Sequence, residues 1–287
     1  MYTKTIIFII ILTVIAYVIY STRAKLRAFD TYKLVISPLE KIEYRTQPPH
    51  SQQKILVFNS FSYKNNILPE YAEYAIKINK RYCDKYGYDY NLISHDAQEL
   101  PPYWLRVKDA YNLLHETSYD VIVYLDLDAV FHDFSKPLTG ILANDYCFYI
   151  GKDPGDLFAT NEINNLVNSG CFIVKNNAWS KKFMRQWLYA CVGDDDELTG
   201  VCKYDWEYKN KKWKCEDCVW AGLKYEQGML ANLYISNVQN AQKYVCILDE
   251  SVLSNQDHLR KSTVLHLMGS SDKKRLDIFK QLYEQPA

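Results

Sequence analysis

Two aspartates, Asp126 and Asp128, are separated by one residue and follow the apolar run Val121–Leu125. Alternate residues of an extended strand point to the same side, so both carboxylates face one spot if the extended geometry continues to the end of the strand. Such carboxylates repel each other unless a cation or a shared proton lies between them. Oxygen ligands favour Mg²⁺ or Mn²⁺, and these ions commonly bind together with phosphates. The pair therefore indicates metal-assisted chemistry on a phosphorylated substrate, with a solvated strand end as the alternative.

The surrounding sequence predicts an α/β fold that would position these carboxylates. A strand as apolar as Val121–Leu125 is expected in the middle of a sheet that is covered on both faces. Upstream, the pattern predicts strands at 54–59 and 88–93, and helices at 69–86 and 103–116. This β-α-β-α-β order indicates a parallel sheet with crossover helices, in which ligands bind beyond the carboxyl ends of the strands.

The second half of the chain contains a charged, cysteine-rich insertion at about residues 191–220. Beyond the end of the helix predicted at 178–191, the composition of this insertion predicts no regular element. A helix end followed by a strand is predicted within 141–150. The other predicted strands lie at 167–174, 245–248 and 264–267, and the helices lie at 178–191, from 225 onward and at 273–283.

Composition limits the classes of function. The chain has 287 residues, of which 48% are hydrophobic, and this is enough for one sizeable core. Its 34 Lys and Arg residues balance 34 Asp and Glu residues, so the formal net charge is zero. We therefore expect no polyanion-binding surface and no nucleic-acid partner.

The N-terminus has the pattern of a membrane anchor. Residues 6–20 are almost continuously apolar and are flanked by basic residues on both sides. No small-residue cleavage site follows, so an uncleaved anchor is preferred to a removed signal peptide. We expect a short tail at 1–4, a transmembrane signal anchor at 5–22, a polar stem at 23–53 and a folded domain at 54–287. The basic residues on both sides leave the orientation open.

Four of the eight cysteines lie in the insertion: Cys191, Cys202, Cys215 and Cys218. The Cys215–Cys218 spacing looks like half of a zinc site, but the further Cys and His ligands that zinc requires are absent nearby in the sequence. Disulfides in an oxidising lumen fit better. Four cysteines allow three pairings, and the sequence does not choose among them.

Five motifs follow in order along the chain. They are Tyr-Trp-Leu-Arg-Val-Lys at 103–108, Tyr-Leu-Asp-Leu-Asp-Ala at 124–129, Asn-Ser-Gly followed by Asn-Asn-Ala-Trp-Ser within 168–180, Tyr-Glu-Gln-Gly at 225–228, and Val-Leu-His-Leu-Met-Gly at 264–269. In this order the chain resembles the galactosyl/mannosyl/xylosyltransferase family. That family includes galactomannan galactosyltransferases, xyloglucan xylosyltransferases and fungal mannan-elongating mannosyltransferases. The resemblance covers roughly residues 55–269.

The resemblance implies a GT-A fold, a mixed and mostly parallel α/β sheet with flanking helices, behind a type II membrane anchor. It also implies a nucleotide-diphosphate sugar donor, a glycan acceptor, a divalent ion (Mn²⁺ or Mg²⁺) and retention of anomeric configuration. Asp126 and Asp128 match the family's metal motif, and His266 matches its late histidine. A ligand set of two carboxylates and one imidazole suits Mn²⁺ better than Mg²⁺.

The resemblance also assigns residues to the donor and the reacting centre. Arg106 is expected near the diphosphate, with Asp126 among the donor-binding residues. The donor sugar is expected at Asn168, Ser169 and Gly170. Glu226 and Gln227 match an acidic-Gln pair at the reacting centre, where a carboxylate can stabilise an oxocarbenium-like transition state. The weaker candidates are Lys108, Asp153 and Asp156.

Two features of this chain depart from the family pattern. Leu267 stands where an aromatic residue is more common, and Ser270 stands where a cysteine is more common. The donor sugar (a hexose or a pentose), its nucleotide (UDP or GDP) and the acceptor are therefore left open. The expected compartment is the Golgi or ER lumen. The alternative function is a non-catalytic nucleotide-sugar or glycan-binding protein on the same fold, which would retain the two aspartates but would not need Glu226.

Overall fold

The computed structural model describes residues 53–62, 67–142, 145–155, 166–193, 200–216 and 218–285 of the chain. The N-terminal tail, the expected anchor at 5–22 and all but the last residue of the expected stem lie outside these ranges. Asp156, one of the weaker site candidates, also lies outside them. Within the described ranges, no helix is both long enough and apolar enough to cross a membrane.

A six-stranded sheet forms the centre of the fold, with the order β2-β1-β3-β6-β5-β9. The strands are β1 (Ile55–Phe61), β2 (Asp89–Ser94), β3 (Val121–Leu125), β5 (Phe148–Gly151), β6 (Asn168–Lys175) and β9 (Val245–Leu248). The predicted parallel arrangement is confirmed for β1, β2 and β3. Strand β6 runs antiparallel to both of its neighbours, β3 and β5, a reversal that the sequence pattern did not predict. The sheet is therefore mixed and mostly parallel.

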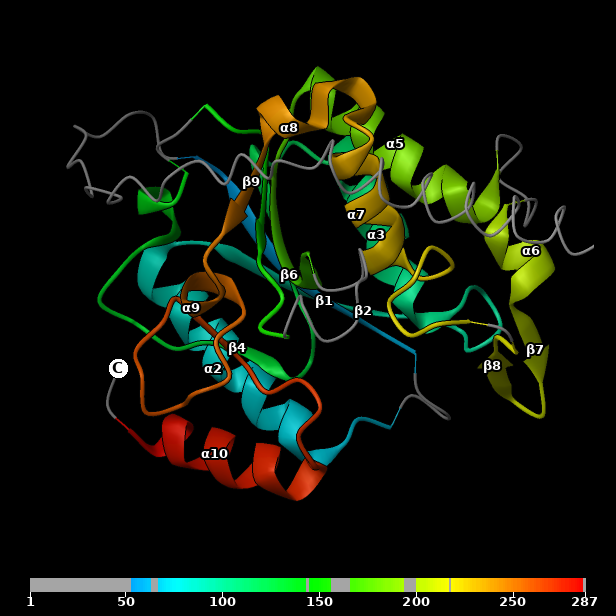
Figure 1. The fold of residues 1–287 in the computed structure, drawn as a ribbon. Helices are drawn as coiled ribbons and strands as arrows, with labels where there is room; N and C mark the ends of the chain where they lie inside the picture. The colour runs from blue at the N-terminus through cyan, green and yellow to red at the C-terminus, as the bar shows by residue number, and fades with distance from the viewer. Residues whose placement is uncertain are drawn as a thin grey trace, which may run out of the picture. The chain divides into compact units, whose positions relative to one another are not determined.

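Helices cover both faces of this sheet (Figure 1). On one face lie α3 (Pro102–Glu116), α5 (Ala178–Val192) and α7 (Glu226–Ile235). On the other lies α2 (Glu70–Tyr86), with α10 (Asp272–Glu284) packed against it. Every residue of β3 is buried, as expected for a central strand between two helical layers. The strands and helices predicted outside the insertion begin within about one residue of the observed ones.

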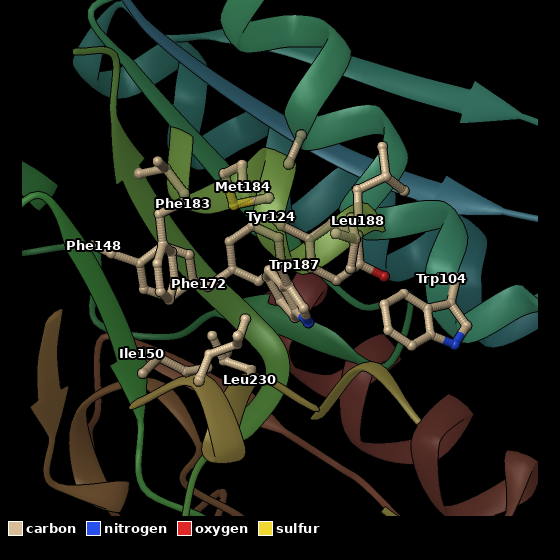
Figure 2. Packing of buried hydrophobic residues seen from close by; sticks show 14 of the residues in the cluster. Trp104, Tyr124, Phe148, Ile150, Phe172, Phe183, Met184, Trp187, Leu188 and Leu230 are labelled. Carbon is tan, nitrogen blue, oxygen red and sulfur yellow. The ribbon is translucent and has the colours of Figure 1, made fainter. Parts of the chain in front are cut away.

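Alternate residues of the strands enter the two layers of core. Tyr124 faces the layer under α3 and α5, whereas Val123 and Leu125 face α2. Figure 2 shows the first layer, in which Tyr124, Phe172 and Trp187 lie together. The ring centroids are 5.1 Å apart between Tyr124 and Phe172, and 5.6 Å apart between Phe172 and Trp187. This aromatic packing fixes the strand that leads into Asp126.

A short antiparallel pair, β4 (Ala129–Phe131) and β10 (Val264–His266), continues from the end of β3 and pairs His266 with Ala129. The side chain of Asn79 on α2 supports β4. Its amide group donates to the carbonyl of Ala129 (3.1 Å), and its carbonyl accepts from the backbone N–H of Phe131 (2.9 Å). The last strand of the domain is thereby held next to the two aspartates.

The cysteine-rich insertion contains more regular structure than its composition indicates. It holds α6 (Val201–Asp205) and a hairpin of β7 (Glu207–Lys209) and β8 (Lys212–Lys214). The hairpin turns at Asn210 and Lys211, whose φ angles of 51° and 61° belong to a tight two-residue turn that Asn adopts readily. The disulfides join Cys191 to Cys202 and Cys215 to Cys218, which selects one of the three pairings. The remaining short elements are η2 (Leu138–Gly140), η4 (Val238–Asn240), α8 (Ala241–Tyr244) and α9 (Glu250–Leu253).

Candidate active site

A pocket of about 510 Å³ lies beyond the carboxyl ends of β1 and β3. This is the edge where open α/β sheets bind ligands, and the volume is typical of small-molecule sites. The pocket brings together all the site residues expected from the sequence, apart from the weaker candidates. These are Arg106, Asp126, Asp128, Asn168, Ser169, Gly170, Glu226, Gln227 and His266.

Three possible metal ligands converge at one end of β3. One ligand atom each from Asp126, Asp128 and His266 lies within 4.8 Å of the others. The Nε2 atom of His266 is 3.2 Å from Oδ1 of Asp128 and 3.7 Å from Oδ2 of Asp126. The extended geometry expected through Asp128 does not hold, because a turn follows β3 and the N–H of Ala129 donates to the carbonyl of Asp126 (2.9 Å). The turn and the β4–β10 pairing together produce the convergence.

The donor set and the space around it fit a divalent ion. Two carboxylates and one imidazole are suitable ligands for Mn²⁺ and acceptable for Mg²⁺. Gly170 on β6 leaves room behind them, because a Cβ atom there would lie 2.1 Å from Cε1 of His266 and 2.7 Å from Oδ2 of Asp126. Any larger residue at this position would displace two of the three candidate ligands.

Two arginines balance the two aspartates. Arg106 on α3 makes a two-pronged contact with Asp126, with nitrogen–oxygen distances of 3.0 Å and 3.2 Å. Arg275 on α10 contacts Asp128 at 2.5 Å. Burial alone would raise the pKa of Asp128, but His266 and Arg275 lower it to about 2. Asp128 is therefore charged, and the two arginines beside the aspartates can also contact phosphate oxygens.

Arg275 is a residue that the motif analysis missed. It lies nine positions after His266, outside the late motif. One signal was present: Lys273, Lys274 and Arg275 form a basic run in the first turn of a helix, where the helix dipole disfavours positive charge. A partner of opposite charge offsets this cost, and for Arg275 the partners are Asp128 and the exposed Asp272.

Glu226 and Gln227 begin α7 and contact the start of β6. The hydroxyl of Ser169 donates to Oε1 of Glu226 (2.7 Å), and the N–H of Ser169 donates to Oε1 of Gln227 (3.1 Å). Glu226 is only 3% exposed, and its other carboxylate oxygen has no hydrogen-bond partner among the residues that the structure describes. Burial raises the pKa of Glu226, although Arg106, 3.7 Å away, acts in the opposite direction. A buried carboxyl group of this kind at a pocket wall is typical of catalytic sites.

Asn168 and the weaker candidates complete the comparison with the sequence. The amide of Asn168 donates to Asp153 (3.1 Å), and its carbonyl accepts from the N–H of Gly170 (3.0 Å). Asp153 therefore lies beside the expected donor-sugar residues. Lys108 forms an ion pair with Glu99 and does not line the pocket.

Aromatic residues to which the sequence analysis assigned no role also line the pocket. The hydroxyl of Tyr124 donates to Oδ1 of Asp126 at 2.5 Å, and Tyr103 and Trp220 lie on the wall next to Tyr225.

Solved structures show where this fold occurs. A glycosyltransferase involved in the glycosylation of the major capsid of PBCV-1 is 14% identical, with a TM-score of 0.55, over 79% of this chain and 99% of that one. The glycosyltransferase GlyE of Streptococcus pneumoniae TIGR4 is 12% identical, with a TM-score of 0.47, over 82% and 61% of the two chains. The galactosyltransferase LgtC, in complex with donor and acceptor sugar analogs, is 13% identical, with a TM-score of 0.41, over 81% and 97%. At these identities the first similarity shows the fold alone.

A comparison with curated proteins finds no match. The family model for nucleotide-diphospho-sugar transferases matches residues 97–275, which is more than half of the chain. The matched range extends from the loop before α3 to Arg275 and contains every pocket residue expected from the sequence. The chain therefore belongs to the nucleotide-diphospho-sugar transferase family, and its mostly parallel sheet with flanking helices is the arrangement of a GT-A glycosyltransferase fold.

Proposed function

We propose that this protein is a metal-dependent glycosyltransferase that moves a hexose or a pentose from a nucleotide-diphosphate sugar to a glycan acceptor. The observation that carries the proposal is the group of Asp126, Asp128 and His266, which lies between two arginines in the same pocket as Glu226. The order of the sequence motifs supports a galactomannan, xyloglucan or mannan type of enzyme, with retention of configuration.

Asp126, Asp128 and His266 would hold the proposed cation, Mn²⁺ or Mg²⁺, which would supply Lewis-acid stabilisation of the nucleoside diphosphate leaving group. Arg106 and Arg275, which contact the aspartates, would be oriented toward the same phosphates and add positive charge there. We place the nucleoside at the wall formed by residues 60–62 and Tyr71, which line the pocket at the end of β1. Contacts in this wall would select between UDP and GDP.

We place the donor sugar against Asn168, Ser169 and Gly170, above the first turn of α7. Glu226 and Gln227 then lie at the reacting centre, where Ser169 holds both side chains in position. A carboxylate there stabilises positive charge that develops on the anomeric carbon. A protein that only bound nucleotide sugars would have no use for the unfavourable burial of Glu226, and this favours the enzyme over the non-catalytic binder.

We also propose that the chain is anchored by residues 5–22 as a type II membrane protein, with the domain in the Golgi or ER lumen. The apolar run supports the anchor. The disulfides Cys191–Cys202 and Cys215–Cys218 support an oxidising compartment. Protease protection of the domain in sealed microsomes would test the orientation, and digestion without detergent would contradict it.

Donor hydrolysis by the full chain tests the proposed reaction. The protein, in a detergent without a sugar headgroup, is incubated with UDP- and GDP-sugars, with Mn²⁺ or with a chelator. We expect release of one nucleotide that depends on the ion and is abolished in Asp128→Ala. The matched control is Asp84→Ala, which removes an exposed aspartate from α2. Turnover that persists in Asp128→Ala, or in the chelator, would refute the assignment.

A further inference from the structure

The most exposed large apolar cluster near the pocket lies between β8 and α7. Val219 is 58% exposed, Trp220 is 65% exposed and Leu223 is 49% exposed. Scattered apolar residues on a surface are normal, but three in five consecutive positions form a patch of the kind that marks a binding surface. Trp220 is the largest of the three and is the one that lines the pocket.

Trp220 belongs to a group of aromatic rings. Its ring centroid lies 5.4 Å from that of Tyr103 and 5.1 Å from that of Tyr225, with interplanar angles of 78° and 61°. Tyr103 and Tyr225 also contact each other, and both contact Trp206. The edge-to-face contacts hold the indole ring of Trp220 while about two thirds of the residue remains open to solvent.

The segment that carries Trp220 is fixed at both ends. Before it, the indole N–H of Trp213 on β8 donates to the carbonyl of Ala97 (2.9 Å), which attaches the start of the segment to the rest of the domain. After it, the carbonyl of Lys224 accepts hydrogen bonds from the indole N–H groups of Trp104 (3.3 Å) and Trp206 (2.9 Å). A surface that is ordered before the ligand arrives loses less entropy on binding, as expected for a binding site.

The segment also packs closely against the start of α7. Ala221 is buried, and a Cβ atom at Gly228 would lie 2.2 Å from the carbonyls of Ala221 and Gly222. Glycine at 228 therefore allows the helix that begins with Glu226 to touch the turn after Trp220. The position of the exposed ring is in this way tied to the position of the candidate reacting centre.

The pocket has two different aromatic walls. Phe61 and Tyr71 belong to the hydrophobic cluster that includes α2 and α10, on the wall where we place the nucleoside. Tyr103 and Tyr225 belong to the cluster under α3 and α7, and Trp220 contacts both of them. Tyr225 directly precedes Glu226. The second wall therefore lies beside the reacting centre, where an acceptor must approach.

We propose that Trp220, supported by Tyr103 and Tyr225, is a stacking platform for a pyranose unit of the acceptor glycan. This inference rests on the proposed function. The C–H groups on one face of a pyranose form an apolar surface that packs on an indole ring, whose face carries negative charge density. The hydroxyl groups at the edge of the sugar remain available to polar groups of the pocket. The platform makes Trp220 a residue that determines acceptor specificity.

Binding of simple sugars to the full chain tests the platform without requiring turnover. The probes are methyl glycosides of the common hexopyranoses and pentopyranoses at millimolar concentrations, with saturation-transfer NMR as the readout. Trp220→Ala should raise the Kd of the bound pyranoside about tenfold, while Trp220→Phe, which keeps a ring, should retain most of the affinity. Leu259→Ala is the matched control, because Leu259 is an 83% exposed apolar residue outside the pocket lining, and it should bind as the wild type does.

Three results would overturn the platform. The wild-type protein binds no pyranoside, Trp220→Ala binds the pyranoside with the same Kd as the wild type, or Trp220→Ala has a higher Kd for UDP or GDP while its Kd for the pyranoside is unchanged. The last result would place the ring on the donor side. The proposed function fails separately. If the protein binds pyranosides through Trp220 but releases no nucleotide from any donor, the platform is supported and the proposed transferase activity is refuted. If it hydrolyses a donor but binds no pyranoside, the transferase activity is supported and the platform is refuted.

Discussion

Replacing Gly170 with alanine should weaken the candidate metal site in addition to destabilising the fold. The added Cβ atom would lie 2.1 Å from Cε1 of His266 and 2.9 Å from its Nε2. Because non-bonded carbon atoms prefer a separation of about 3.5 Å or more, the imidazole must recede by about 1.4 Å. Metal–ligand distances tolerate deviations of only about 0.2 Å. A histidine displaced this far no longer completes the ligand group with Asp126 and Asp128.

The expected magnitudes separate the two effects. Overpacking a core position costs about 1–3 kcal/mol of stability, whatever the role of the site. An ion at a hundredfold excess over its Kd stabilises the wild-type protein by about 2.7 kcal/mol. For a domain of this size, that corresponds to a rise in Tm of roughly 5–10 °C. If the displaced histidine weakens binding by about a hundredfold, the same ion concentration contributes only about 0.4 kcal/mol, or about 1 °C.

The assay is thermal unfolding of wild type and variant with and without Mn²⁺. The matched control is Gly200→Ala, at the start of α6 and away from the pocket lining. A Cβ atom at Gly200 would lie 2.3 Å from the backbone carbonyl of Ala190 on α5. Both variants should have a lower Tm than the wild type in the absence of the ion. Only Gly170→Ala should also lack the increase in Tm that Mn²⁺ produces. An increase in Gly170→Ala equal to that of the wild type would show that the ion does not bind where we place it.

Three further predictions concern the framework of the domain. The hydrogen bond to Asp109 is the main cause of a raised His95 pKa, so the stabilisation from His95 is present below pH 6.5 and is lost as the pH rises through the raised pKa. His95→Gln should therefore destabilise the protein at pH 6 and progressively less in alkaline buffer. Equal destabilisation at all pH values would contradict this. Removing the Cys191–Cys202 disulfide with a double serine substitution should cost about 3 kcal/mol in urea unfolding, and the difference from the wild type should vanish in reductant. Asn79→Leu, which leaves two backbone groups of β4 without their partner, should cost about 2–4 kcal/mol, whereas a cost below about 1 kcal/mol would show that water replaces the amide.

Much of the fold could be predicted because its signals are local. The alternation of apolar strands with amphipathic helices before Asp126 determined β1 to β3 and the helices between them. The direction of β6 was not predictable, because periodicity carries no information about which neighbour a strand pairs with. The hairpin in the insertion was missed because each strand has only three residues, so the alternation around its single aromatic residue, Tyr208 or Trp213, is too short to be recognised.

The candidate site was predictable to the extent that motifs mark it. Asp126 and Asp128 were indicated by their spacing alone, whereas His266 required the order of several motifs, since a lone histidine on a short strand resembles an ordinary core residue. The contact of Arg275 with Asp128 and the exposure of Trp220 depend on tertiary packing. No pattern of spacing along the chain encodes such contacts.

The pairing of β4 with β10 has a consequence for how the protein matures. Because this pairing brings His266 next to Asp128, the candidate ligands come from opposite halves of the chain, and Arg275 arrives even later in synthesis. Long-range pairings of this kind form late and slowly compared with local structure. A nascent chain with β1 to β3 already in place would hold two aspartates without their third ligand, so it would bind a divalent ion poorly. The ion site that we propose is therefore complete only when the domain is complete, and a chain truncated before its last strand would lack His266 as a ligand.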